Sequence, residues 1–171
     1  MIDLMRFVRA VPDFPKPGVM FRDLTPLMGD AVALHDTIEA LVAPYIGAGV
    51  EVVAGMEARG FIFGALAAGA LGAGFVPLRK PGKLPAEVEA VTYALEYGTA
   101  SLEVHRDALG PGRRVLLVDD VLATGGTAAA SVDLLSRLGA EIVGCAFVLE
   151  LDALGGRARL TGQRFHSVLH L

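Results

Sequence analysis

The stretch VLLVDDVLATGGTAAAS, residues 115–131, runs from aliphatic residues through two adjacent carboxylates into a loop rich in Gly and Thr. The aliphatic part is typical of a strand buried on both faces, as the strands of parallel sheets are. The residues after the loop, TAAASVDLLSRL, predict a helix that ends at Gly139. A strand, a tight loop and a helix in this order form one unit of an α/β fold.

The same alternation of strand and helix continues along the rest of the chain. The further expected elements are helices at 31–46 and 60–71 and strands at 51–55, 75–78 and 141–151. Two runs on either side of Gly98 and Thr99 predict a β-hairpin, inserted near one end of the fold. We therefore expect an α/β fold with a mainly parallel central sheet flanked by helices.

The composition indicates one globular domain over residues 1–171, since 53% of the residues are hydrophobic and no repeat or linker interrupts them. A net charge of −4 disfavours a nucleic-acid partner. The single Cys145 lies in an apolar run, so we expect a buried core residue and a reducing compartment. The first residues lack the apolar core and cleavage site of a signal peptide, which favours the cytoplasm. The uncharged run 60–78 is too rich in Gly and Ala to favour a membrane span.

Three expected strand ends carry unusual residues. In sheets of this kind, ligands bind beyond the carboxyl ends of the strands. The three segments are MEARG at 56–60, RKPGK at 79–83 and DDVLATGGT at 119–127. They converge on one site if their strands are neighbours in the sheet.

The loop at 123–127 has the features of an anion site. Gly125 and Gly126 allow the backbone amides to turn inward at a helix N-terminus, where the helix dipole favours an anion such as a phosphate monoester. Thr124 and Thr127 add neutral hydroxyl donors. The alternative is that one of these threonines only caps the helix. The chain contains neither GxxxxGK[ST] nor GxGxxG, which disfavours the common ATP and dinucleotide loops.

Asp119 and Asp120 repel each other at the end of an apolar strand. We expect them to meet a cation or hydroxyl donors, and a ribose diol fits one phosphate-length from the loop. The alternative is a solvated pair of loop carboxylates.

The other two segments carry charges that suit a polyanion. Arg79, Lys80 and Lys83 lie within five residues, although solvated basic loops are also common. Glu57 and Arg59 occupy a turn in which Arg59 can point at the same anion. The alternative is that these two charges pair with each other.

The remaining candidates are weaker. His166 and His170 are four residues apart, but two histidines are too few ligands for a metal site. His35 and His105 lie in sequence contexts that indicate a solvated surface. Glu96 is an acid within an apolar hairpin strand, where an outward-facing residue is the common case.

At this point the motifs match a known family. VLLVDDVLATGGT is similar to the phosphoribosyl pyrophosphate signature of the type I phosphoribosyltransferases. Four further motifs occur in the order and approximate spacing of the branch that acts on adenine: FPKPGVMFRDLTPL, EARGFIFGA, VPLRKPGKLP and YALEYG. The resemblance covers nearly the whole chain. It implies a type I phosphoribosyltransferase-like core with a small N-terminal hood segment, about residues 1–30, that contributes to the base site.

The resemblance also implies a reaction, in which adenine and phosphoribosyl pyrophosphate give AMP and pyrophosphate. Mg²⁺ is expected through the pyrophosphate, with no protein ligand assigned to it. The family is usually a cytoplasmic homodimer. A loop at 80–97 is expected to close over the site and exclude water.

The resemblance assigns roles to individual residues. It implies that the 5′-phosphate binds to Ala123, Thr124, Gly125, Gly126 and Thr127. The ribose hydroxyls are expected to bind to Asp119 and Asp120. The pyrophosphate is expected to bind to Arg59, Arg79, Lys80 and Lys83. Adenine is expected to bind to the main chain of Met20 and Arg22, with Phe21 near its ring and Leu151 against the other face of the ring. Glu96 matches the family's proposed acid–base residue near purine N7, with Tyr97 beside it. Glu57 stands where Asp is also found, so it receives no role.

Two alternatives compete with this assignment. A sister enzyme could act on another base, such as a 6-oxopurine. A non-catalytic regulator could sense phosphoribosyl pyrophosphate through the same fold, but such regulators usually carry an added DNA-binding segment. The early position of FPKPG and the acidic balance disfavour the regulator.

Overall fold

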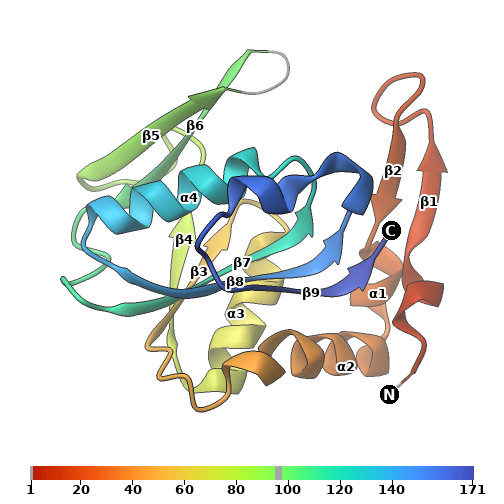
Figure 1. Cartoon of the computed structure of the whole chain (residues 1–171), viewed down its shortest axis with the longest axis horizontal. Helices are drawn as coiled ribbons and strands as arrows, with labels where there is room; N and C mark the ends of the chain where they lie inside the picture. The colour runs from red at the N-terminus through yellow and green to blue at the C-terminus, as the bar shows by residue number, and fades with distance from the viewer. Residues whose placement is uncertain (1, 95–97) are drawn as a thin grey trace.

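A five-stranded parallel sheet forms the centre of the protein in the computed structural model, which describes residues 2–94 and 98–171 (Figure 1). Its strand order is β4-β3-β7-β8-β9. The strands are β3 (Val52–Met56), β4 (Gly74–Leu78), β7 (Arg114–Leu122), β8 (Glu141–Glu150) and β9 (Phe165–His170). The predicted parallel sheet is therefore confirmed.

Helices cover both faces of this sheet (Figure 1). The helices α2 (Ala31–Val42) and α3 (Gly60–Leu71) pack on one face, and α4 (Gly126–Arg137) packs on the other. Successive residues of β7 alternate between the two cores, because side chains of a strand point to opposite faces in turn. Val115 lies in the core beneath α4, whereas Leu116 lies in the core beneath α2 and α3. Cys145 is fully buried in the α4 core, as predicted.

The helix α2 is shorter than its sequence pattern predicts. Asp30 caps its N-terminus by accepting hydrogen bonds from the backbone N–H groups of Val32 and Ala33. The helix ends at Val42 and a 3₁₀ turn follows at Ala43–Tyr45. Pro44 explains this early end, because proline lacks the N–H that a continuing α-helix needs.

The predicted hairpin is also present. It consists of β5 (Val88–Ala94) and β6 (Thr99–His105), which pair antiparallel. The hairpin joins the edge of the central sheet through backbone hydrogen bonds between Arg79 and Glu103, with N···O distances of 2.9 and 2.7 Å. Among the residues described, every helix falls short of the length and apolar content that a membrane crossing needs.

The N-terminal segment forms a ribbon apart from the central sheet. It contains a 3₁₀ turn (Leu4–Phe7), β1 (Arg9–Pro12), β2 (Met20–Asp23) and the short helix α1 (Thr25–Gly29). Among the strands of the described residues, β1 and β2 pair with each other alone, antiparallel. Asp13 closes the connection between them, because its carboxylate accepts a 2.7 Å hydrogen bond from the N–H of Gly18. In the view of Figure 1 this ribbon and the β5–β6 hairpin lie at opposite sides of the molecule.

Candidate active site

The three segments that the sequence singles out lie side by side. Strand β3 pairs with β4 on one side and with β7 on the other, all parallel. The carboxyl ends of these strands therefore reach the same edge of the sheet, where MEARG, RKPGK and DDVLATGGT follow them. The strand neighbourhood that their convergence requires, which the sequence left open, is therefore present.

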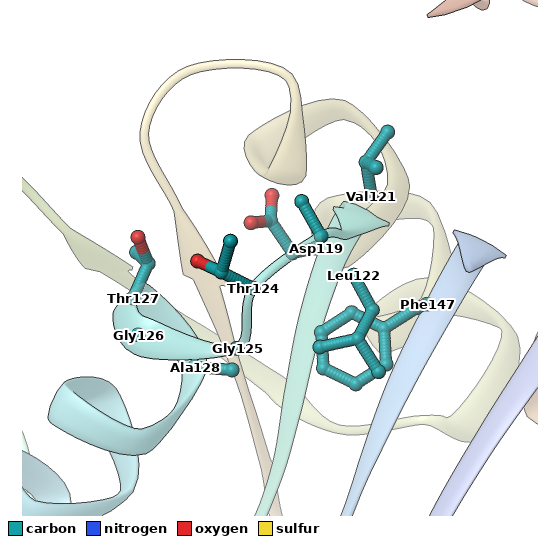
Figure 2. Close-up of a pocket in the computed structure, with 10 residues that line it drawn as sticks. Asp119, Val121, Leu122, Thr124, Gly125, Gly126, Thr127, Ala128 and Phe147 are labelled. Atoms are coloured by element: carbon teal, nitrogen blue, oxygen red, sulfur yellow. The ribbon is translucent and has the colours of Figure 1, made fainter. Parts of the chain in front are cut away.

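Residues 123–127, which we call the phosphate-binding loop, line a hollow at the end of β7 (Figure 2). The hollow is completed by Asp119, Val121, Leu122, Ala128 and Phe147. Its volume is about 80 Å³.

The N-terminus of α4 opens into this loop without a side-chain cap. Gly125 is the N-cap residue, and its φ of +77° is a conformation that glycine adopts readily. The alternative interpretation, in which Thr124 or Thr127 caps the helix, is wrong for the structure described. Thr127 instead exchanges a 3.1 Å hydrogen bond with the hydroxyl of Tyr93 on the hairpin. The first N–H groups of α4 are thus left for an anion.

The two carboxylates at the end of β7 have different surroundings. Asp120 is 6% exposed and forms an ion pair with the guanidinium of Arg59. Asp119 lines the hollow, and its Oδ1 accepts a 2.9 Å hydrogen bond from the N–H of Asp120. Burial, together with the neighbouring charge of Asp120, raises the pKa of Asp119 well above its ordinary value. The expectation that these carboxylates meet a cation is confirmed for Asp120.

Arg59 connects this strand end to the N-terminal ribbon. Its guanidinium carbon lies 5.5 Å from the ring centroid of Phe21, within cation–π range. Phe21 in turn meets Phe14 edge to face, with centroids 5.1 Å apart. The segment MFRD on β2 is thereby brought next to the carboxylates of β7.

Glu57 contacts three residues of the segment 79–83 that follows β4, which we call the basic loop. Its side chain is 8% exposed and forms ion pairs with Lys83 and with Arg79, whose Nε lies 3.4 Å from Oε2. The backbone N–H of Lys80 donates a 2.9 Å hydrogen bond to the same carboxylate. The alternative in which Glu57 pairs with Arg59 is therefore wrong. Glu57 pairs instead with residues that follow β4, and Arg59 pairs with Asp120 on β7.

A second cavity lies between the basic loop, the hairpin and the phosphate-binding loop. Its lining includes Glu57 and Lys80 on one side, Tyr93 and Ser101 from the hairpin, and Thr127. The cavity joins the positions where the sequence places the pyrophosphate and the 5′-phosphate. The candidate site is thus an edge-of-sheet groove roofed by the hairpin.

The predicted adenine residues come from two places in the fold. Met20, Phe21 and Arg22 lie on β2, and Met20 is 49% exposed. Leu151 follows β8, and its N–H donates a 2.9 Å hydrogen bond to the carbonyl of Leu122 at the end of β7. Both groups therefore adjoin the end of β7. Glu96 and Tyr97 lie outside the residues that the structure describes.

Three of the histidines lie away from this groove. His35 lies 3.4 Å from Glu39 on the exposed side of α2. A ring nitrogen of His166 lies 3.1 Å from the carbonyl oxygen of Ala40, and a ring nitrogen of His105 accepts from the N–H of Ala86. The solvated position expected from the sequence is confirmed for His35, whereas His105 is half-buried.

Comparison with known proteins identifies the family. The model for the phosphoribosyl transferase domain matches residues 32–161. A curated relative from Methylococcus capsulatus, named adenine phosphoribosyltransferase, is 65% identical over 163 residues, which cover 95% of each chain. The chain belongs to the adenine phosphoribosyltransferase family.

Solved structures of adenine phosphoribosyltransferases agree with this. The enzyme from Rhodothermus marinus is 51% identical with a TM-score of 0.95, covering 98% of this chain and 96% of that one. The enzyme from Saccharomyces cerevisiae, complexed with an imino-altritol bisphosphate and adenine, is 38% identical with a TM-score of 0.92. That match covers 97% of this chain and 96% of the yeast chain.

Sequence reasoning missed two residues of this phosphoribosyltransferase site. Gly60 lies against Asp119, because a Cβ built on Gly60 would be 2.7 Å from Asp119 Oδ1. Tyr93 bonds to Thr127 across the groove. The signal for Gly60 was its place at the start of a helix that follows a charged turn. Tyr93 gave no signal, because its partner lies 34 residues further along the chain.

The Glu57 ion pairs predict a pH dependence of stability. The hydrogen bond from Lys83 lowers the pKa of Glu57 to about 2, against the opposing effect of burial and with help from the N–H of Lys80. Because this pKa is lower in the folded chain than in the unfolded one, the contribution is complete at neutral pH and is lost as the pH falls from about 4.5 towards 2. Wild type should therefore unfold at a higher temperature than Glu57→Gln near pH 7, with the difference shrinking below about pH 4.5.

Thermal unfolding followed by circular dichroism across this pH range checks the prediction. Glu39→Gln is the control, since the Glu39 side chain is 66% exposed. A midpoint difference between wild type and Glu57→Gln that stays constant with pH would contradict it.

Proposed function

We propose that the chain transfers the 5-phosphoribosyl group from phosphoribosyl pyrophosphate to adenine, giving AMP and pyrophosphate in purine salvage. The observation that carries the proposal is the hollow at the end of β7, which is lined both by the uncapped N-terminus of α4 and by the carboxyl group of Asp119. A phosphate needs the first feature and a sugar hydroxyl needs the second.

The ribose 5-phosphate half of the substrate occupies this hollow. The phosphate accepts hydrogen bonds from the amides of residues 123–127 and from the hydroxyls of Thr124 and Thr127. The ribose hydroxyls bind at Asp119 and Asp120. Asp120 pairs with Arg59, so the ion pair holds the Arg59 guanidinium beside the ribose site, where it can contact the negatively charged pyrophosphate.

The pyrophosphate half binds beside it, at Arg59, Arg79, Lys80 and Lys83. Glu57, which lines the second cavity, pairs with both Arg79 and Lys83. Pyrophosphate then competes with a carboxylate for cations that are already in place, which lowers the cost of ordering their long side chains.

Mg²⁺ accompanies the pyrophosphate. The ion is carried by the pyrophosphate oxygens, which are the hard ligands that Mg²⁺ prefers, and no residue of the chain is assigned as its ligand. When bound, the ion neutralises charge on the leaving pyrophosphate. The chain's own residues hold the 5′-phosphate, the pyrophosphate and the sugar between them.

Adenine binds between the N-terminal ribbon and Leu151, with the main chain of Met20 and Arg22 reading its edge and Phe21 near its ring. The displacement at the anomeric carbon passes through an oxocarbenium-like state, so positioning and charge stabilisation contribute most. Glu96 acts as the acid–base group near N7. Closure of the segment 80–97 excludes water, which otherwise competes as nucleophile.

Measured AMP formation from adenine and phosphoribosyl pyrophosphate tests the proposal. We expect adenine to be used faster than hypoxanthine, guanine or xanthine. Faster turnover of a 6-oxopurine would favour the sister enzyme instead. Binding of phosphoribosyl pyrophosphate without product from any purine would favour the regulator.

The ribose assignment predicts a selective loss in Asp120→Asn. The variant should raise the KM for phosphoribosyl pyrophosphate by about tenfold or more, with a smaller change in the KM for adenine. Steady-state kinetics with each substrate varied in turn provide the measurement. Asp133→Asn, an exposed carboxylate paired with Arg137 on α4, is the matched control. Equal losses for both substrates would count against the ribose role.

We also propose a cytoplasmic homodimer. Ile62 and Leu66 on α3 are 43% and 41% exposed, which leaves an apolar helix face that a second copy would cover. Light scattering should give twice the 17.8 kDa mass of the chain. Leu66→Glu should shift the protein towards the monomer, and a monomeric wild type would refute the dimer.

A further inference from the structure

Gly156 packs directly against the phosphate-binding loop. A Cβ built on Gly156 would overlap the carbonyl oxygen of Ala123 and lie 3.1 Å from the nitrogen of Gly125. The reverse also holds, since a Cβ on Gly125 would overlap the carbonyl oxygen of Gly156. The two backbones touch with no room for a side chain on either, so glycine is required on both sides of the contact.

The turn that carries Gly156 is short and irregular. Two 3₁₀ turns, Asp152–Leu154 and Gly156–Arg159, are joined by Gly155, whose φ is +63°. Figure 1 shows this turn in blue beside the end of α4 where that helix begins. A segment of this kind has little regular backbone pairing of its own, so its position depends on how its side chains are anchored.

Arg157 anchors the turn to the sheet. Its Nε and Nη2 both donate to the carboxylate of Glu150, the last residue of β8, with an Nη2–Oε2 distance of 2.9 Å. Glu150 is 2% exposed and also accepts a 2.7 Å hydrogen bond from the hydroxyl of Ser167 on β9. The guanidinium carbon lies 4.8 Å from the ring centroid of Phe165. The anchor therefore fixes the turn to two neighbouring strands.

A metal is a poor alternative explanation for this cluster. Oxygen or nitrogen atoms of Glu150, Asp152 and His170 lie close enough together to share an ion. However, Arg157 engages both oxygens of Glu150, and His170 lies 3.0 Å from Asp152. A cation there would first have to displace a two-point arginine contact to a buried carboxylate, which is costly.

We propose that Gly156, held by the Arg157–Glu150 ion pair, positions the phosphate-binding loop for phosphoribosyl pyrophosphate. Gly156 and Arg157 are positioning residues, because they act through the backbone of residues 123–127 and do not contact the substrate. The inference rests on the proposed function, in which that loop holds the 5′-phosphate. A displacement of about 1 Å in such a loop can cost up to about 100-fold in rate.

Gly156→Ala tests the contact, with Gly110→Ala in the exposed turn before β7 as its control. Alanine at position 156 must push the loop away, whereas a Cβ at Gly110 meets nothing within 4 Å. We expect Gly156→Ala to raise the KM for phosphoribosyl pyrophosphate by about tenfold or more and to leave the KM for adenine within about twofold. Gly110→Ala should leave both KM values within about twofold of wild type. Thermal unfolding of each variant separates these effects from lost folding.

Arg157→Lys tests the Arg157–Glu150 ion pair. It also provides an independent test of the proposal if Gly156→Ala does not fold. Lysine keeps the positive charge but loses the two-point contact with Glu150. We expect the same selective rise in the KM for phosphoribosyl pyrophosphate, smaller in size, and a weaker calorimetric affinity for ribose 5-phosphate.

Three results would overturn the inference while the wild type makes AMP. They are an unchanged KM for phosphoribosyl pyrophosphate in the folded variants, equal rises for both substrates, and an equal effect in Gly110→Ala. A wild type that makes no AMP would instead overturn the proposed function, and this inference with it.

Discussion

The pairing of β3 between β4 and β7 is the constraint on which the rest of the site depends. Because all three strands run parallel, the residues that follow them emerge at one edge of the sheet. The register also fixes which charges can meet. Glu57 leaves β3 towards the basic loop after β4, and Arg59 leaves the same turn towards Asp120 on β7.

Much of this arrangement could be predicted from local sequence patterns. The strand–loop–helix unit around residues 115–137 follows from an aliphatic run and paired glycines. The hairpin follows from two strand-like runs around Gly98 and Thr99, and the parallel sheet follows from the alternation of aliphatic strands and helices. The end of α2 was predicted too late because Pro44 outweighs the apolar spacing around it. The strands β1 and β2 are four residues each, too short for an alternating pattern to stand out.

The contacts that position the site were harder to predict, because they join residues far apart in the chain. Nothing near Glu57 in the sequence indicates Lys83 as its partner, 26 residues away. Gly156 had a weak signal in the paired glycines of LGGR, but the sequence does not show that they face Gly125. Such pairings depend on strand order, which local periodicity leaves open.

The ion pairs among the groove's own side chains affect how binding depends on ionic strength. A bare basic patch gains charge pairs when it binds an anion, so added salt weakens binding steeply. Here Arg79 and Lys83 already hold Glu57, and Arg59 already holds Asp120. An anion that binds there exchanges one negative partner for another, and salt screens the old pairs as well as the new. The affinity of this groove for a polyanion should therefore vary less with salt than its number of cations suggests.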